Sequence, residues 1–180
     1  MSTLKSRPIL LILALALILR LVYGLAQDPS APYHDAGGDM AWYLANGYAL
    51  SSGQDNTTLA GFGASGSYPV ELRNLPTPPL YLLFVGLPQT ILRPSAAVQA
   101  IRILQALLGT LTIYCAYRLG RCIAQNERAG LITALVLALH PAFIVESAQI
   151  ATETLYIALV VAALMNCSSK SKNSLVLRQK

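Results

Sequence analysis

The chain has 180 residues, of which 54% are hydrophobic and only 12% are charged, and its mean hydropathy is +0.52. Such a chain is too apolar and too poor in charge for an ordinary soluble domain. Its net charge of +5 comes from basic residues scattered along the sequence, without the basic stripe of a nucleic-acid-binding protein, so no nucleic-acid partner is expected. The composition predicts an all-α integral membrane protein.

The first apolar run covers residues 8–26 and follows two basic residues. It is long enough to cross a hydrocarbon core of about 30 Å. A cleaved signal peptide has a similar basic start and apolar core, and Gly24 and Ala26 are small enough for a cleavage site. Arg20 interrupts the run just before that site, which favours a retained membrane span. In such a span Arg20 is expected to snorkel toward the far interface.

The segment 27–76 differs in composition from the rest of the chain. It is rich in Gly, Ser, Asn, Thr and Pro, and it carries five of the eight acidic residues. Only residues 39–50 within it have a helical pattern, while the remainder is typical of loops. The proline-led segment 78–92 is short for a span and contains Pro88. We therefore predict an extracytoplasmic loop over residues 27–97, with surface helices at about 39–50 and 78–92.

Three later apolar runs are candidate membrane spans, at about 98–119, 129–145 and 150–165. The dipeptide His140-Pro141 lies near the end of the second of them, where a proline ends or kinks a helix. A polar, basic tail over residues 166–180 follows the last run.

Charge favours one topology for this arrangement. With four spans, nine of the thirteen basic residues and only one of the eight acidic residues fall on the cytoplasmic side. If segment 78–92 also spanned, the basic cluster over 118–128 and the tail would lie outside. The positive-inside bias therefore predicts four spans in a module over residues 1–165, with both termini cytoplasmic.

Asp39 follows a glycine pair and starts the predicted helix 39–50, in which Tyr43 and Asn46 share its face. One role for Asp39 is the N-cap of this helix. Another is catalytic, because a carboxylate at a helix N-terminus is held charged and fixed in orientation, as a general base or a metal ligand requires. Asp35, just ahead of it, is either a second acid or a turn residue.

Two further charged residues lie near the predicted membrane surface. Glu153 starts the span 150–165, where an ionisable residue is a functional candidate, although it also fits an interfacial carboxylate that reaches the lipid headgroups. Arg102 lies one turn into the span 98–119. Arginine binds phosphate bidentately, so Arg102 fits either a substrate phosphate or an anchor to lipid phosphate.

The order of these motifs resembles a known family. Asp39, followed by Tyr43 and by small residues at 51–53, resembles the first extracytoplasmic loop of polyprenyl-phosphate-sugar-dependent glycosyltransferases. These enzymes form the GT-C superfamily, which includes protein mannosyltransferases and lipid A aminoarabinose transferases. The stretch PTPPLYLLFVG is similar to the surface helix that follows in that family, and AIRILQALLGTLTIYCAYRLGR begins the part similar to its next three spans. The similarity covers about residues 8–165, the N-terminal portion of the family's membrane module.

The resemblance implies a membrane glycosyltransferase that moves a sugar from a polyprenyl-phosphate donor to an extracytoplasmic lipid, glycan or protein acceptor by inverting displacement. Asp39 would be the catalytic acid that deprotonates or positions the acceptor hydroxyl, and Glu153 would match the family's second acidic position. Arg102 is our candidate for binding the donor phosphate, and Tyr43 and Asp35 are further candidates for substrate binding. A divalent cation is the one cofactor that such a site suggests.

The chain also departs from the family's pattern. Met40 stands where many members have a second acid, Glu153 replaces a commoner aspartate, and Thr77 or Pro78 stands where some members have a lysine. Family members carry many more spans, so we expect a fragment, a frameshifted product or a small protein that reuses the module. The alternative function is a four-span membrane binding or scaffold protein without catalytic activity.

Overall fold

The computed structural model describes residues 7–34, 39–53 and 78–178. Within these ranges the chain forms eight α-helices and no strand, which confirms the all-helical prediction for this part of the chain. In chain order the helices are α1 (Arg7–Ala26), α2 (Ala31–His34), α3 (Asp39–Ser52), α4 (Pro79–Ile91), α5 (Pro94–Ala124), α6 (Glu127–Leu139), α7 (Pro141–Glu146) and α8 (Glu153–Arg178).

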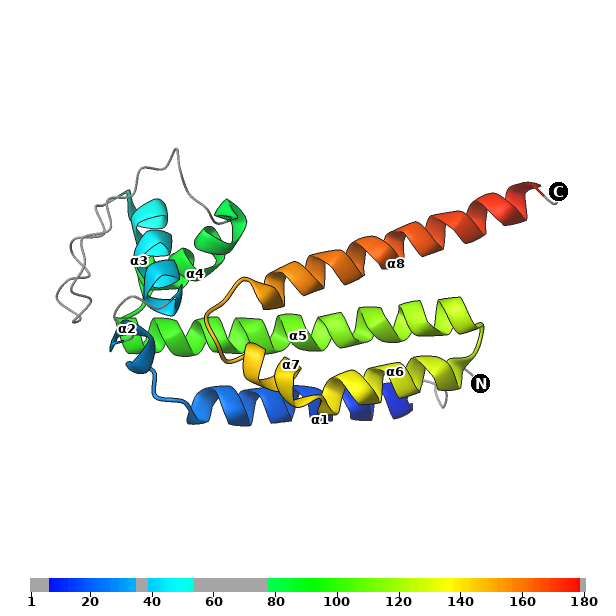
Figure 1. Cartoon of the computed structure of the whole chain (residues 1–180), viewed down its shortest axis with the longest axis horizontal. Coiled ribbons are helices and arrows are strands. Elements are labelled where there is room, and N and C mark those ends of the chain that lie inside the picture. Colours follow the sequence, from blue (N-terminus) through cyan, green and yellow to red (C-terminus); the bar gives the residue numbers. More distant parts are fainter. Residues whose placement is uncertain (1–6, 35–38, 54–77, 179–180) are drawn as a thin grey trace.

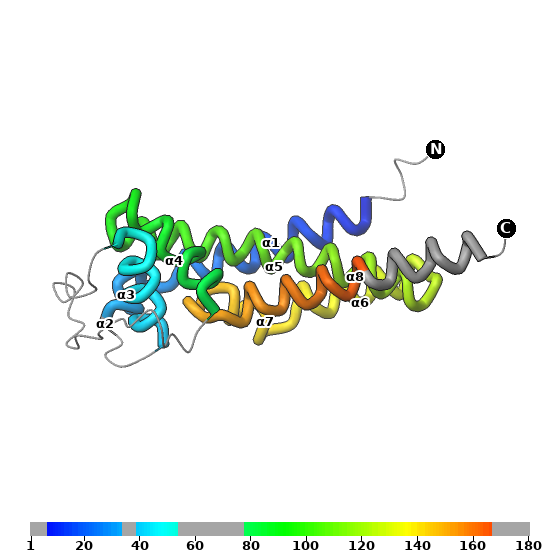
Figure 2. Tube along the Cα trace, turned by 90° about the horizontal axis from the view of Figure 1, so that it is seen from above, coloured from blue at the N-terminus to red at the C-terminus, as the bar shows by residue number. Residues whose placement is uncertain are grey.

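Helices α1, α5, α6 and α8 form an elongated bundle, and α2, α3 and α4 lie at one of its ends (Figure 1). Helix α5 is the centre of this bundle, because it packs against α1, α4, α6 and α8. The start of α1 and the far end of α8 both lie at the end opposite α3 (Figure 1). The view from above shows the same position for the start of α1 (Figure 2). The chain therefore passes along the bundle four times.

Residues close to the turn between α5 and α6 determine where the two helices end and begin. Gln125 adopts a left-handed conformation with φ of 53°, which ends α5. The Asn126 side chain then accepts a hydrogen bond of 2.9 Å from the backbone N–H of Arg128 and caps α6. Gly130 allows the two helices to approach closely, because a Cβ there would lie 2.7 Å from the Tyr117 carbonyl oxygen. The two helices are thus held antiparallel.

Two helices, α1 and α5, are long and apolar enough to cross a membrane, and they correspond to the predicted spans 8–26 and 98–119. Helix α4 and the segment Glu153–Asn166 of α8 are shorter apolar helices. The predicted span 129–145 is divided, because α6 ends at Leu139 and α7 begins at Pro141. This division confirms the predicted helix break at His140-Pro141, and the count of four spans stays a prediction.

The two predicted surface helices are present as α3 and α4. They pack against α2, against α5 and on each other. Their shared core, which we call the aromatic platform, consists of buried residues and of partly buried residues that pack against them. These residues are Tyr33, Met40, Tyr43, Leu44, Tyr81, Phe84, Val85, Val98, Ile101, Ile150 and Leu155.

Arg20 faces the bundle interior, so the expectation that it snorkels to an interface is wrong. Its side chain is 2% exposed, and its guanidinium donates to the carbonyl oxygens of Ala16 at 3.1 Å, Leu137 at 3.3 Å and Ala138 at 3.5 Å. The last two carbonyls end α6, where Pro141 has no N–H to offer the Leu137 oxygen. A cation at the negative end of the helix dipole is also stabilising.

Candidate functional site

Helices α3 and α4 form a tightly joined pair at the end of the bundle. A Cβ on Gly47 would lie 2.6 Å from Val85 Cγ2, and one on Gly86 would collide with the Gly47 carbonyl oxygen. Gln89 adds a polar tie, because its Nε2 donates to the carbonyl oxygens of Leu44 in α3 and Val85 in α4, both at 3.0 Å. The two helices are therefore in backbone contact, which fixes α3 on the bundle.

Asp39 is the first residue of α3 and is exposed, so its carboxylate lies in the first turn of an anchored helix. One turn further on, the half-buried Tyr43 ring meets the Tyr81 ring edge-on, with centroids 5.2 Å apart. Asn46, predicted on the same face, is buried and donates to the Trp42 carbonyl oxygen at 2.7 Å. The face predicted for α3 thus runs from solvent at Asp39 into the aromatic platform.

Tyr81 of α4 was not predicted as a site residue, because no sequence motif marks it. It is 1% exposed, and its hydroxyl has no hydrogen-bond partner within the described ranges. Burial raises the pKa of Tyr81 well above its usual value, and the nearby Tyr43 and Glu153 raise it further. The Tyr81 hydroxyl therefore stays neutral, and it lies within electrostatic reach of both predicted site residues.

Glu153 begins α8 and is exposed. Its neighbour Thr154 is buried and donates to the Glu146 carbonyl oxygen at 3.2 Å. The next residue, Leu155, is part of the aromatic platform. These contacts fix the first turn of α8 beside the same cluster that receives Tyr43. The fold therefore brings together two of the predicted site residues that are far apart in the sequence.

Arg102 joins three parts of the fold. It is 5% exposed, and its Nε donates to the Ala148 carbonyl oxygen at 3.2 Å. Its two Nη atoms donate to the carbonyl oxygens of Gln27 at 2.9 Å and Asp28 at 3.3 Å. Arg102 thus ties the exit of α1 and the connection between α7 and α8 to α5, and the predicted contact with a donor phosphate stays a prediction.

Asp35, the remaining predicted site residue, lies outside the described residues, and a divalent cation was the suggested cofactor. Asp28 accepts hydrogen bonds from the Ser30 backbone N–H at 2.8 Å and from its hydroxyl at 2.7 Å, which makes a local turn. In the part of the chain that the structure describes, no group of three or more His, Cys, Asp and Glu side chains could hold a metal ion.

The arrangement can support acid–base chemistry at one end of the bundle. It offers an exposed carboxylate at the start of α3, a second exposed carboxylate at the start of α8, and a buried cluster, the aromatic platform, to which both helices contribute side chains. A carboxylate in the first turn of an anchored helix is fixed in position, as a proton acceptor requires.

Comparison with known proteins identifies a family. A family model described as dolichyl-phosphate-mannose-protein mannosyltransferase matches residues 77–173, which is more than half of the chain. The matched range includes Tyr81, Arg102 and Glu153, while Asp39 and Tyr43 precede it. Neither a curated protein nor a solved structure matches the chain.

Proposed function

The chain belongs to the dolichyl-phosphate-mannose-protein mannosyltransferase family, and from this membership we propose that it transfers a sugar from a polyprenyl-phosphate donor to an extracytoplasmic acceptor, with Asp39 as the base. Membership makes the chain a membrane glycosyltransferase of the GT-C type. The donor, the acceptor and the residue roles below are our proposal.

The single observation that carries the proposal is the place of Asp39. Its carboxylate is exposed at the first turn of α3, and α3 is held by the contact between Gly47 and Gly86. In the proposed reaction the Asp39 carboxylate accepts the proton of an acceptor hydroxyl. The hydroxyl oxygen then forms a bond to the anomeric carbon, the bond from that carbon to the donor phosphate breaks, and the lipid phosphate leaves with the electron pair. The sugar configuration inverts in this single displacement.

Glu153 and Tyr43 are proposed to position the reactants. Glu153 lies at the start of α8, beside the aromatic platform on which Tyr43 packs, and its charge reaches Tyr81. A second carboxylate there can orient a sugar hydroxyl or a divalent cation. Asp35 remains a candidate for substrate binding by its place in the sequence alone. Arg102 supports the site by holding the chain around it, and we propose that its remaining N–H groups face the donor phosphate.

The topology of the proposal follows from the four passes of the chain. Helices α2, α3 and α4 are placed outside the membrane, and both termini are placed in the cytoplasm. The structure supports this, because the start of α1 and the far end of α8 share one end of the molecule (Figure 1). Arg118, Arg121 and Arg128 lie where α5 meets α6, at that same end.

The test is sugar transfer by membrane vesicles that contain the chain, with radiolabelled polyprenyl-phosphate mannose as the probe. We expect Asp39→Asn to lower transfer at least about a hundredfold, the loss typical of removing a general base. Glu127→Gln is the matched control, because Glu127 also lies in the first turn of a helix but at the opposite end of the bundle. Equal transfer by the two variants would contradict the role of Asp39 and favour the binding or scaffold function.

A further inference from the structure

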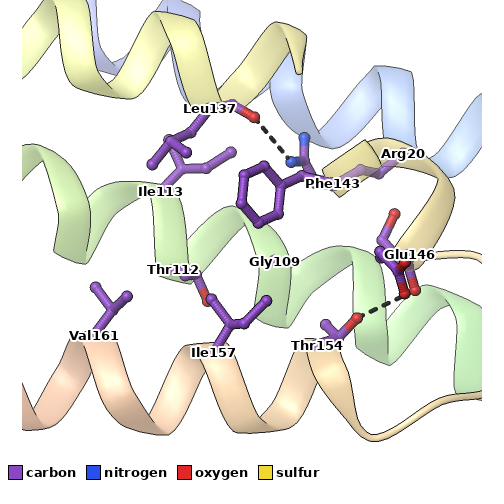
Figure 3. A pocket seen from close by; sticks show the side chains of 11 residues that line it. Arg20, Gly109, Thr112, Ile113, Leu137, Phe143, Glu146, Thr154, Ile157 and Val161 are labelled. Carbon is purple, nitrogen blue, oxygen red and sulfur yellow. Dashed lines mark hydrogen bonds between the residues drawn. The ribbon is translucent and has the colours of Figure 1, made fainter. Parts of the chain in front are cut away.

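A cavity of about 130 Å³ lies among α1, α5, α6, α7 and α8, and apolar side chains such as Ile113, Phe143 and Val161 line most of it (Figure 3). An apolar cavity of this size accommodates about one benzene-sized group. A phospholipid is several times larger than that. This cavity is therefore no lipid site, and a lipid bound to the bundle must lie on its outer surface.

One face of α5 changes from apolar to cationic toward the end of the helix. Leu107 and Leu111 are 48% and 55% exposed. Tyr114 is half-buried, and Arg118 and Arg121 are exposed. These five positions are spaced by three or four residues, so they share one face of the helix, which we call the α5 stripe. The α5 stripe therefore has an apolar part and a cationic part, like the chain and the headgroup of an anionic lipid.

Tyrosine side chains hold both arginines of the α5 stripe. Arg118 Nη1 donates to the Tyr114 hydroxyl at 3.2 Å, and its Cζ lies 5.9 Å from the centre of the Tyr114 ring. Arg121 makes the same two contacts with Tyr117, at 3.4 Å and 5.6 Å. These contacts restrict the guanidiniums, which lowers the entropy lost when a ligand binds. Because the tyrosines are neutral, both guanidiniums keep their charge and further N–H groups for an anion.

The charges around the end of α5 favour an anion over a cation. Residues 118–128 include three arginines and one acid, Glu127, which gives a net charge of +2. Arg128 is exposed in the first turn of α6. Helix α6 also lies close to the α5 stripe, because a Cβ on Gly130 would be 3.0 Å from Arg121 Cβ. A headgroup with a net negative charge is therefore attracted to this end of the bundle.

The length of α5 places the two arginines at the level of lipid headgroups. Its 31 residues span about 46 Å, which exceeds a hydrocarbon core of about 30 Å. With the core centred on the helix, Arg118 lies at one edge of the core and Arg121 lies just outside it. Leu107 is about 16 Å from Arg118 along the axis, close to half the thickness of the core. The α5 stripe thus matches the length of a lipid in one leaflet.

We propose that the α5 stripe binds a phospholipid that carries a net negative charge. The phosphate accepts hydrogen bonds from Arg118 and Arg121, and one acyl chain lies along Leu111 and Leu107. This site is at the end of the bundle opposite Asp39, so it goes beyond sugar transfer and does not depend on it (Figure 1).

The experiment is native mass spectrometry of the full chain, purified in mild detergent and titrated with phosphatidylglycerol, phosphatidylcholine of the same acyl chains, or glycerol 3-phosphate. We expect one phosphatidylglycerol per chain, bound about 25-fold more tightly than phosphatidylcholine, because each arginine near an anionic headgroup contributes about fivefold. Glycerol 3-phosphate lacks the acyl chains and should bind more weakly than phosphatidylglycerol. Equal binding of the two lipids would overturn the proposal, and so would equal binding of glycerol 3-phosphate and phosphatidylglycerol.

A double variant tests the cationic part of the α5 stripe. Arg118→Gln combined with Arg121→Gln should weaken binding of phosphatidylglycerol about 25-fold and remove the preference over phosphatidylcholine. Arg93→Gln is the matched control and should change neither, because Arg93 is exposed at the other end of the same helix. A preference that survives in the double variant, or an equal loss in Arg93→Gln, would mean that the lipid binds elsewhere.

A further variant tests whether Tyr114 positions Arg118. Tyr114→Leu removes the ring and the hydroxyl that Arg118 contacts but keeps an apolar side chain, so binding of phosphatidylglycerol should weaken about two- to fivefold. Tyr156→Leu is the control at an exposed position of α8 and should leave binding unchanged. Equal binding by these two variants would contradict the positioning role of Tyr114.

Discussion

Two buried tyrosine hydroxyls in the aromatic platform differ in their hydrogen bonding. Tyr33 donates to the Pro94 carbonyl oxygen at 3.4 Å, and burial raises its pKa to about 12. Tyr81 has no partner within the described ranges, although it is the more deeply buried of the two. A buried hydroxyl without a partner costs stability, so removing it from Tyr81 and from Tyr33 should have opposite effects on the free energy of unfolding.

We expect Tyr81→Phe to leave the free energy of unfolding unchanged or to raise it by up to about 1 kcal/mol, because it removes a desolvated hydroxyl and keeps the ring. Tyr33→Phe is the matched comparison and should lower it by about 0.5–1.5 kcal/mol, because it removes a hydroxyl that is bonded. Thermal unfolding in detergent measures both. A clear loss of stability in Tyr81→Phe would mean that its hydroxyl has a partner in the folded protein.

At the scale of elements, the pair α3 and α4 determines where Asp39 lies. Neither helix is long enough to hold its place alone, and their backbones meet at Gly47 and Gly86. A side chain at either glycine would have to push the two helices apart. Displacement of α3 would move the Asp39 carboxylate relative to Glu153, which is anchored separately by Thr154.

We therefore expect Gly86→Ala to lower the free energy of unfolding by about 1–3 kcal/mol, the usual cost of overpacking, and to lower sugar transfer with it. Leu87→Ala is the control on the next position of α4, where the side chain is 56% exposed, and it should change stability by less than about 0.5 kcal/mol. Wild-type stability in Gly86→Ala, measured by thermal unfolding in detergent, would argue against close packing of the pair.

Most of the ends of these helices could be predicted from nearby proline and glycine residues in the sequence. The proline-led start of α4, the glycine pair ahead of α3 and the dipeptide His140-Pro141 each act within one turn of the chain, so their effects follow from the sequence. The two surface helices and the break in the third apolar run were predicted for this reason.

The partners of buried polar groups could not be predicted in the same way. Arg20 bonds to carbonyls 117 and 118 residues away, and Arg102 bonds to carbonyls 46 to 75 residues away. Snorkelling was expected for Arg20 because a single helix in lipid offers it no acceptor, whereas the folded bundle offers the free end of α6. The lack of a hydrogen-bond partner for the Tyr81 hydroxyl among the described residues likewise results from tertiary packing.

At the scale of the whole molecule, α6 is too short to cross a hydrocarbon core alone. Its 13 residues span about 20 Å, against a core of about 30 Å. A helix can end inside a membrane only where its free carbonyls find donors within the protein. Arg20 supplies such donors at Leu137 and Ala138, so the pass made by α6 and α7 is compatible with a bilayer. Four passes therefore remain our prediction for the topology.

This topology places the connection between α7 and α8 outside and the connection between α5 and α6 inside. Gln149 and Gln125 are exposed residues of the same type in these two connections. With the three native cysteines replaced by serine, we expect a membrane-impermeant maleimide to label Gln149→Cys in right-side-out vesicles and Gln125→Cys in inverted vesicles. The opposite pattern would place Asp39 on the cytoplasmic side. Labelling of both positions from one side would mean that α6 and α7 do not cross the bilayer, because they are the only helices between these two positions.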